Sequence, residues 1–152
     1  MKVPVTYSDW MECFDILKEG GRDSEILECT RKGKLTLSAG VAGRFATQLN
    51  NVIQYRFKKA SDKFDRAMQI NNGDPNSLSS SLLMLRREIS FLIQFAHLPV
   101  LPPEDVKLLI DAIKNQAATM QQSLESSAKR MDRTGMLASI IKKDRIDKLE
   151  GL

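Results

Sequence analysis

The sequence predicts an all-α protein: an antiparallel bundle of three long helices, with a small N-terminal helical lobe and a C-terminal amphipathic helix. Two stretches, 76–96 and 103–131, place apolar or small residues at alternating steps of four and three, the spacing of a heptad. A third, 39–70, carries a continuous apolar stripe at helical spacing and contains no proline. Glycine and proline cluster between these stretches, where helices end and the chain reverses.

The length of 152 residues predicts one compact domain, because domains typically have about 100 to 150 residues and two would not fit. We expect residues 1–38 to form the N-terminal lobe and residues 39–152 to form the bundle. The apolar fraction of 42% is that of a folded globular chain and argues against disorder.

The N-terminal lobe is expected to hold two short helices. The first follows Ser8, a residue type that caps helices, and runs over 10–19 until Gly20 and Gly21 end it. The second starts at a capping Asp23 and reaches residue 32, where Gly33 follows. Residues 34–38 alternate apolar and polar side chains over too short a stretch for a reliable strand, so we expect an extended loop.

The long stripe over 39–70 predicts a helix of about 48 Å, at about 1.5 Å per residue. Residues 71–75, Asn-Asn-Gly-Asp-Pro, form a strong turn signal, because asparagine and glycine tolerate positive φ and proline cannot continue a helix. The next helix, over 76–96, should be the most buried one, since its middle is apolar on nearly every side.

Three prolines between 98 and 103 exclude a helix there, and Pro103 suits a first helical turn. The helix over 103–131 then carries the most regular heptad pattern of the chain. Its predicted seam consists of Val106, Ile110, Ile113, Ala117, Met120, Leu124, Ser127 and Met131. This pattern favours a coiled coil, although a neighbouring helix with the same step predicts that the seam packs within its own bundle.

Beyond residue 131, the cluster 132–135 breaks or bends the chain, and a final amphipathic helix is expected to follow. Its apolar positions exceed what a three-helix core requires, so we select them as candidate partner-binding residues: Leu137, Ile140, Ile141, Ile146 and Leu149.

The charge of +4 and the pI near 9.1 permit a polyanionic partner without requiring one. The clearest basic pattern lies in the second half of the 39–70 helix, where four residues share one face: Arg56, Lys59, Lys63 and Arg66. We name these four the basic face. A solvated helix surface is the simpler interpretation, and a phosphate-binding surface is the alternative.

No pattern typical of an active site stands out. The single histidine, His97, has no carboxylate or thiol neighbours at ligand spacing, and Cys13 and Cys29 lack a metal-binding or redox spacing. Residues 126–129 match Ser-x-x-Lys, a short pattern expected by chance and without its companion motifs. We therefore expect no metal, no cofactor and no enzymatic activity.

The sequence also predicts a cytoplasmic protein. The first ten residues show no secretory signal, no apolar run reaches the length of a membrane span, and two cysteines fit reduced thiols. We interpret the chain as a non-enzymatic helical protein–protein interaction module, an adaptor, regulator or assembly subunit that binds a protein partner or self-associates. A nucleic-acid-binding bundle that uses the basic face is the alternative.

Overall fold

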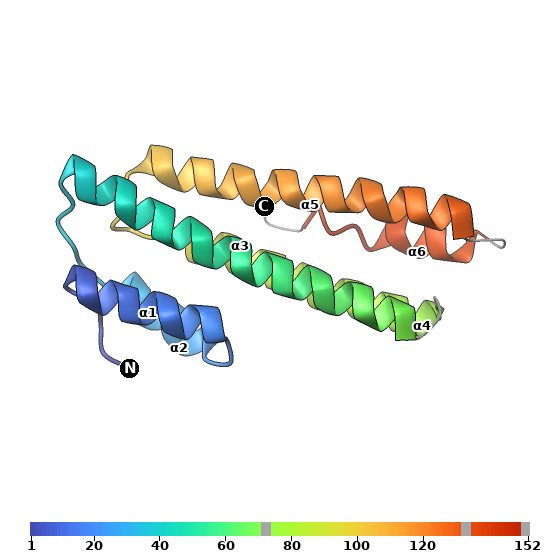
Figure 1. The fold of residues 1–152 in the computed structure, drawn as a ribbon, viewed down its shortest axis with the longest axis horizontal. Helices are drawn as coiled ribbons and strands as arrows, with labels where there is room; N and C mark the ends of the chain where they lie inside the picture. The colour runs from blue at the N-terminus through green and yellow to red at the C-terminus, as the bar shows by residue number, and fades with distance from the viewer. Residues whose placement is uncertain (71–73, 132–134, 150–152) are drawn as a thin grey trace. The chain divides into compact units, whose positions relative to one another are not determined.

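The computed structural model describes residues 1–70, 74–131 and 135–149, and it confirms the all-α class. Six helices are present in this part of the chain, and it contains no strand. The helices follow one another as α1 (Tyr7–Glu19), α2 (Asp23–Arg31), α3 (Ala39–Ile70), α4 (Pro75–Ala96), α5 (Pro103–Met131) and α6 (Met136–Lys143), as Figure 1 shows.

The bounds of the three long helices agree with the sequence prediction to within one residue. α3 and α5 begin and end where they were predicted, and α4 begins at Pro75 instead of residue 76. The turn predicted over 71–75 and the break predicted over 132–135 lie mainly outside the described residues.

The chain divides into two compact units that differ from the predicted boundary at residue 38. The first unit comprises Met1–Arg56 and Gln94–Ile110, and the second comprises Phe57–Ile93 and Asp111–Leu152. Residues 1–38 therefore share a compact unit with the beginning of α3 and with the segment that joins α4 to α5.

An aromatic cluster forms the core of the first unit. The rings of Trp10, Phe14 and Phe45 pack together, with the Phe45 centroid 5.4 Å from Trp10 and 5.1 Å from Phe14. Phe95 adds an edge contact to Phe14 at 6.5 Å. All four side chains are buried, so residues from α1, α3 and α4 enclose one apolar centre.

Local hydrogen bonds fix α1 within this unit. The Thr6 side chain accepts from the Asp9 amide and the Asp9 carboxylate accepts from the Thr6 amide, which together form a capping box. Thr6 therefore caps the helix, and the prediction that Ser8 does so is wrong. The Asp9 pKa is lowered, chiefly because its carboxylate accepts a hydrogen bond from the backbone of Val5.

Gly33 fits closely against the Trp10 indole. A Cβ atom at Gly33 would lie 2.5 Å from the Trp10 ring, so only glycine fits this position. Next to it, the Trp10 ring nitrogen donates to the Lys34 carbonyl at 3.4 Å, and the Lys34 amide donates to the Pro4 carbonyl at 3.0 Å. The segment that follows α2 is thereby held to α1.

Leucine and isoleucine residues from α4 and α5 fill the second unit, where Leu82, Leu92 and Ile113 are fully buried. The residues that line shared cavities give the relative direction of α4 and α5. Leu78, at the start of α4, lines one cavity with Ala128, near the end of α5; Ile93, at the end of α4, lines another with Ala117. Within this unit, α4 and α5 therefore run antiparallel.

The buried line of α5 departs from the predicted heptad seam in the second half of the helix. Ile110, Ile113 and Ala117 are buried as predicted. After them, the predicted Met120 is half-buried and Ser127 is exposed, while Gln121 and Ala128 are buried. Steps of 3, 4, 4, 3 and 4 from residue 110 to residue 128 average the 3.6 residues per turn of a straight helix, not the 3.5 of a heptad.

Candidate interaction site

The C-terminal segment, residues 135–149, contains a short helix and an irregular end. α6 begins after Gly135, whose φ of 76° is left-handed, and the Asp144 amide donates to the Ile140 carbonyl where the helix ends. The sequence predicted an amphipathic helix that includes Ile146 and Leu149. That extent is wrong, because the helix stops at Lys143.

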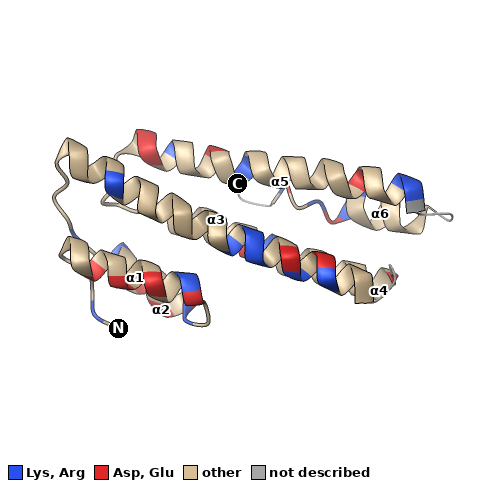
Figure 2. Ribbon diagram, viewed as in Figure 1, with Lys and Arg blue, Asp and Glu red and all other residues tan. Residues whose placement is uncertain are grey.

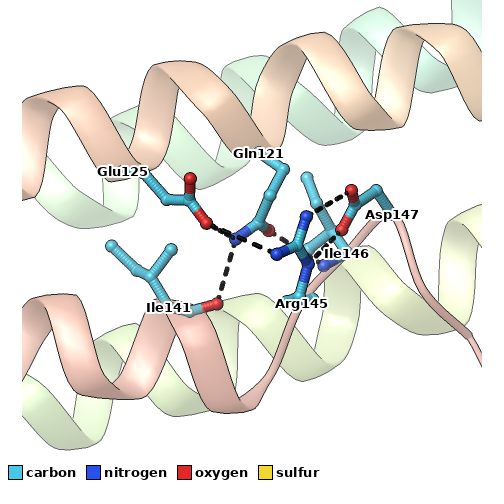
Figure 3. Close-up of polar contacts among 6 residues, drawn as sticks. All are labelled: Gln121, Glu125, Ile141, Arg145, Ile146 and Asp147. Atoms are coloured by element: carbon cyan, nitrogen blue, oxygen red, sulfur yellow. Dashed lines mark hydrogen bonds and ion pairs between the residues drawn. The ribbon is translucent and has the colours of Figure 1, made fainter.

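Gln121 explains why the helix stops. This α5 side chain is fully buried, and its amide nitrogen donates to the Ile141 carbonyl at 3.1 Å. Its amide oxygen accepts from the Ile146 amide, also at 3.1 Å (Figure 3). In a longer helix the Ile141 carbonyl would accept from the amide of Arg145. Gln121 takes that role instead, so the chain can leave the helix without an unsatisfied buried carbonyl at Ile141.

Three charged side chains, Arg145, Asp147 and Glu125, form an ionic group beside this contact. The Arg145 guanidinium donates to both Asp147 carboxylate oxygens, at 2.8 and 2.7 Å, and lies 3.8 Å from the Glu125 carboxylate (Figure 3). The hydrogen bond from Arg145 is the main cause that lowers the Asp147 pKa. Glu125 also accepts from the Gln121 amide nitrogen at 3.1 Å, so the ionic group and the buried amide form one network.

The C-terminal segment also contacts α4. The Arg86 side chain lies 3.8 Å from the Asp144 carboxylate, and both side chains are about one-third exposed. Such a pair contributes little to stability by itself. Together with the Gln121 network, however, this pair means that the short stretch 141–147 contacts both α4 and α5.

The structure separates the five candidate partner-binding residues into two groups. Ile141 and Ile146 are 4% and 0% exposed, so they belong to the core of the second unit. Leu137, Ile140 and Leu149 are half-buried. Met136, which the sequence analysis did not select, is 53% exposed. The apolar surface of the segment is therefore centred on residues 136–140.

An apolar pocket of about 580 Å³ lies beside α6 in the second unit. α3, α4, α5 and α6 all contribute to its wall. Among the described residues, those that line it are Phe64, Asp65, Met68, Gln69, Leu78, Leu124, Ser127, Ala128, Leu137 and Ile141. Seven of these ten residues are apolar, Asp65 is the only charged one among them, and none is basic.

The basic face keeps three of its four predicted residues at the surface. Lys59, Lys63 and Arg66 are exposed. Arg56 is only 8% exposed and donates to both carboxylate oxygens of Asp23, at 2.8 and 3.0 Å, and to the Leu17 carbonyl. It therefore ties α3 to α1 and α2 within the first unit and is not available to a phosphate.

Acidic residues interrupt the same stretch of helix. Asp62 and Asp65 are exposed between the three remaining basic residues, and Figure 2 shows the two signs of charge mixed along the second half of α3. Mixed signs at a helical spacing are typical of a solvated surface with internal ion pairing, and they weaken the attraction for a polyanion.

The residues considered for chemistry do not form a site in the described ranges. His97 is exposed after the end of α4, Cys13 is buried, and the Cys29 thiol donates to the Met1 carbonyl at 3.3 Å. Burial is the main cause that raises the Cys13 pKa, which disfavours its reactive thiolate form. Across the described residues no group of three or more histidine, cysteine or acidic side chains is arranged to hold a metal ion. In the same residues, no helix combines the length and apolar character that crossing a bilayer requires.

Sequence reasoning missed Gln121, the residue that organises the C-terminal segment. The heptad step assigned its neighbour Met120 to the seam and did not include Gln121. A 3.6-residue step continued from Ile110 would have placed position 121 on the buried side. A polar residue on that line would then have indicated a specific buried hydrogen bond.

Comparisons of the chain with protein-family models, with curated proteins and with solved structures find no match.

Proposed function

We propose that this protein is a non-enzymatic helical protein–protein interaction module that binds a protein partner, or a second copy of itself, through the apolar surface of α6. One observation carries the proposal: α6 is held firmly to the second unit and still leaves apolar side chains in contact with solvent. Met136 is 53% exposed, and Leu137 and Ile140 are half-buried beside it.

The exposed apolar side chains of the C-terminal segment indicate a contact surface because the segment is firmly attached to the second unit. Exposed apolar residues on a loosely held tail are common and need no explanation. Here Ile141 and Ile146 are buried, and Gln121 bonds to the backbone of both residues. A surface held in one conformation loses little entropy on binding, which favours its use as a contact surface.

Apolar side chains that remain exposed beside a buried attachment are typical of contact surfaces, because the apolar area gains free energy when a partner removes it from water. The nearby pocket adds a concave wall that includes Leu137. Nucleic-acid binding through Lys59, Lys63 and Arg66 is the weaker proposal. Arg56 is bound to Asp23 and is not available to a phosphate, and two aspartates lie between the remaining basic residues.

The test compares the full chain with two acidic variants on α6, Met136→Glu and Ile140→Glu. Light scattering gives the mass in solution, and capture from a host lysate followed by mass spectrometry identifies partners. We expect a dimer or a defined partner with the unaltered chain, and a loss of at least about tenfold in its affinity with either variant, as expected for a central apolar contact.

Leu108→Glu is the matched control. Leu108 lies on α5 and is 68% exposed, so the same apolar-to-acidic change is made at an exposed helical position outside the C-terminal segment. The control should bind as the unaltered chain does. A chain that stays monomeric and captures no partner, or α6 variants that bind as well as the control, would contradict the proposal.

A further inference from the structure

The apolar pocket beside α6 has the composition of a site for a small molecule. Its volume of about 580 Å³ lies within the range of about 300–1,000 Å³ that is typical of ligand pockets. Such pockets combine an apolar wall with a few polar groups that orient the ligand. Here Phe64, Met68 and Leu78 supply part of the wall, and Asp65, Gln69 and Ser127 supply the polar groups.

Among the described residues that line the pocket, the only charge is negative. Asp65 brings a carboxylate to the lining, and the other nine described lining residues bring no charge of either sign. A second carboxylate, Asp62, lies one turn earlier on the same helix. Partial burial, with a smaller contribution from Asp62, raises the pKa of Asp65.

From this geometry we propose that the pocket binds a small amphipathic amine, whose apolar body packs against Phe64, Met68 and Leu124 while its ammonium group pairs with the Asp65 carboxylate. The Asp65 carboxylate attracts a cation in the pocket and repels an anion. The proposal goes beyond the protein-binding function, because its ligand is of another class.

Three probes with the same apolar body and different head groups test the charge preference: 4-phenylbutylamine, 4-phenylbutanol and 4-phenylbutyrate. Each is titrated into the isotope-labelled full chain, and two-dimensional NMR follows the residues that line the pocket. We expect the amine to bind about threefold more tightly than the alcohol, as a partly solvated ion pair provides, and the acid to bind more weakly than both.

Two variants test whether the preference for the amine depends on Asp65. Asp65→Asn should remove the preference for the amine over the alcohol, so that their affinities become equal. Asp62→Asn is the control, because it removes the same charge from the same helix at an exposed position that does not line the pocket. It should keep most of the preference.

Ser127→Leu tests whether the pocket itself is the site. Ser127 is exposed and lines the pocket, so a leucine there should fill part of the space and weaken the binding of all three probes. Ser126→Leu is the matched control, since Ser126 is the exposed neighbour on the same helix and does not line the pocket. It should leave all three affinities unchanged.

Four results would overturn the proposal. The first is that no probe shifts the resonances of the lining residues up to its solubility limit. The second is equal binding of the amine and the alcohol, and the third is an amine preference that survives Asp65→Asn. The fourth is a dimer that Ser127→Leu dissociates while Ser126→Leu does not, because a second copy of the chain would then occupy the pocket.

Discussion

Replacing Gln121 by leucine should loosen the C-terminal segment and lower the stability of the chain. Leucine is similar in size to glutamine, so the change leaves little cavity but removes the partners of the Ile141 carbonyl and the Ile146 amide. A buried backbone group without a partner costs about 1–3 kcal/mol. Two such groups would give about 2–6 kcal/mol if the segment stayed in place.

We expect a loss of about 2–4 kcal/mol in the free energy of unfolding, the lower part of that sum, because partial detachment of the segment lets water reach both groups. Urea denaturation measures the global loss. Hydrogen exchange measures the local one, and the Ile146 amide, which donates to Gln121, should lose most of its protection.

Gln122→Leu is the control for this experiment. Gln122 is the next residue on α5 and is exposed, so the same substitution there should change the free energy of unfolding by less than about 0.5 kcal/mol. If Gln121→Leu were as stable as the control and the Ile146 amide kept its protection, the role assigned to Gln121 would be refuted.

Three further predictions concern single contacts. Gly33→Ala should cost about 1–3 kcal/mol of unfolding free energy in urea denaturation, because its methyl group would overlap the Trp10 ring. Arg56→Met should cost about 1–3 kcal/mol by the same measurement, since it breaks a buried ion pair whose acidic partner is partly solvated. Asp147→Asn should destabilise the chain at neutral pH but progressively less in acid, as urea denaturation over a pH series would show. The lowered pKa of Asp147 in the folded state provides stability above its unfolded pKa of about 4, and this stability is lost as the pH falls through the folded value.

Each of these predictions can fail in a defined way. Gly40→Ala is the control for the glycine change, because a Cβ atom at Gly40 meets nothing within 4 Å, and it should stabilise the chain by up to about 1 kcal/mol. Arg66→Met is the control for Arg56, because Arg66 is exposed on the same helix. If either pair of variants showed equal stability, the corresponding contact would be unimportant. Asp147→Asn would fail if its stability ran parallel to that of the unaltered chain at every pH.

The basic face allows a separate test of the weaker proposal. Reversing the charge of Lys59, Lys63 and Arg66 should abolish nucleic-acid binding if the face carries it, and binding of the unaltered chain should fall steeply as salt rises. Fluorescence anisotropy with labelled DNA and RNA measures both. An absence of binding at low salt, or binding that charge reversal leaves unchanged, would eliminate nucleic acid as the partner.

The long helices could be predicted from the sequence because their signals are local. An apolar stripe, the prolines around residue 100 and the glycines after residue 19 each act within a few residues of where they stand. The start of α1 was less accurate, because Thr6 and Asp9 bond to each other's backbone and this reciprocal pair outcompetes a single Ser8 cap.

The candidate site was harder to predict, because its properties depend on contacts between distant residues. Arg56 shares a helical face with Lys59 and Lys63, but Asp23, 33 positions away, binds its guanidinium and removes it from that face. Ile146 continued an amphipathic pattern, but Gln121, 25 positions away, binds its amide and places it beyond the end of the helix. The heptad step marks neither partner, and only a 3.6-residue step along α5 would have placed Gln121 on the buried side.

The measurement that tests the central claim most directly is hydrogen exchange of α6 in the free and the bound chain. The full chain is compared alone, at low concentration, and with its partner or at a concentration where it self-associates. We predict slower exchange over 136–140 on binding and little change over the exposed part of α3 around Lys59 and Lys63. Slower exchange around Lys59 and Lys63, with 136–140 unchanged, would contradict the claim.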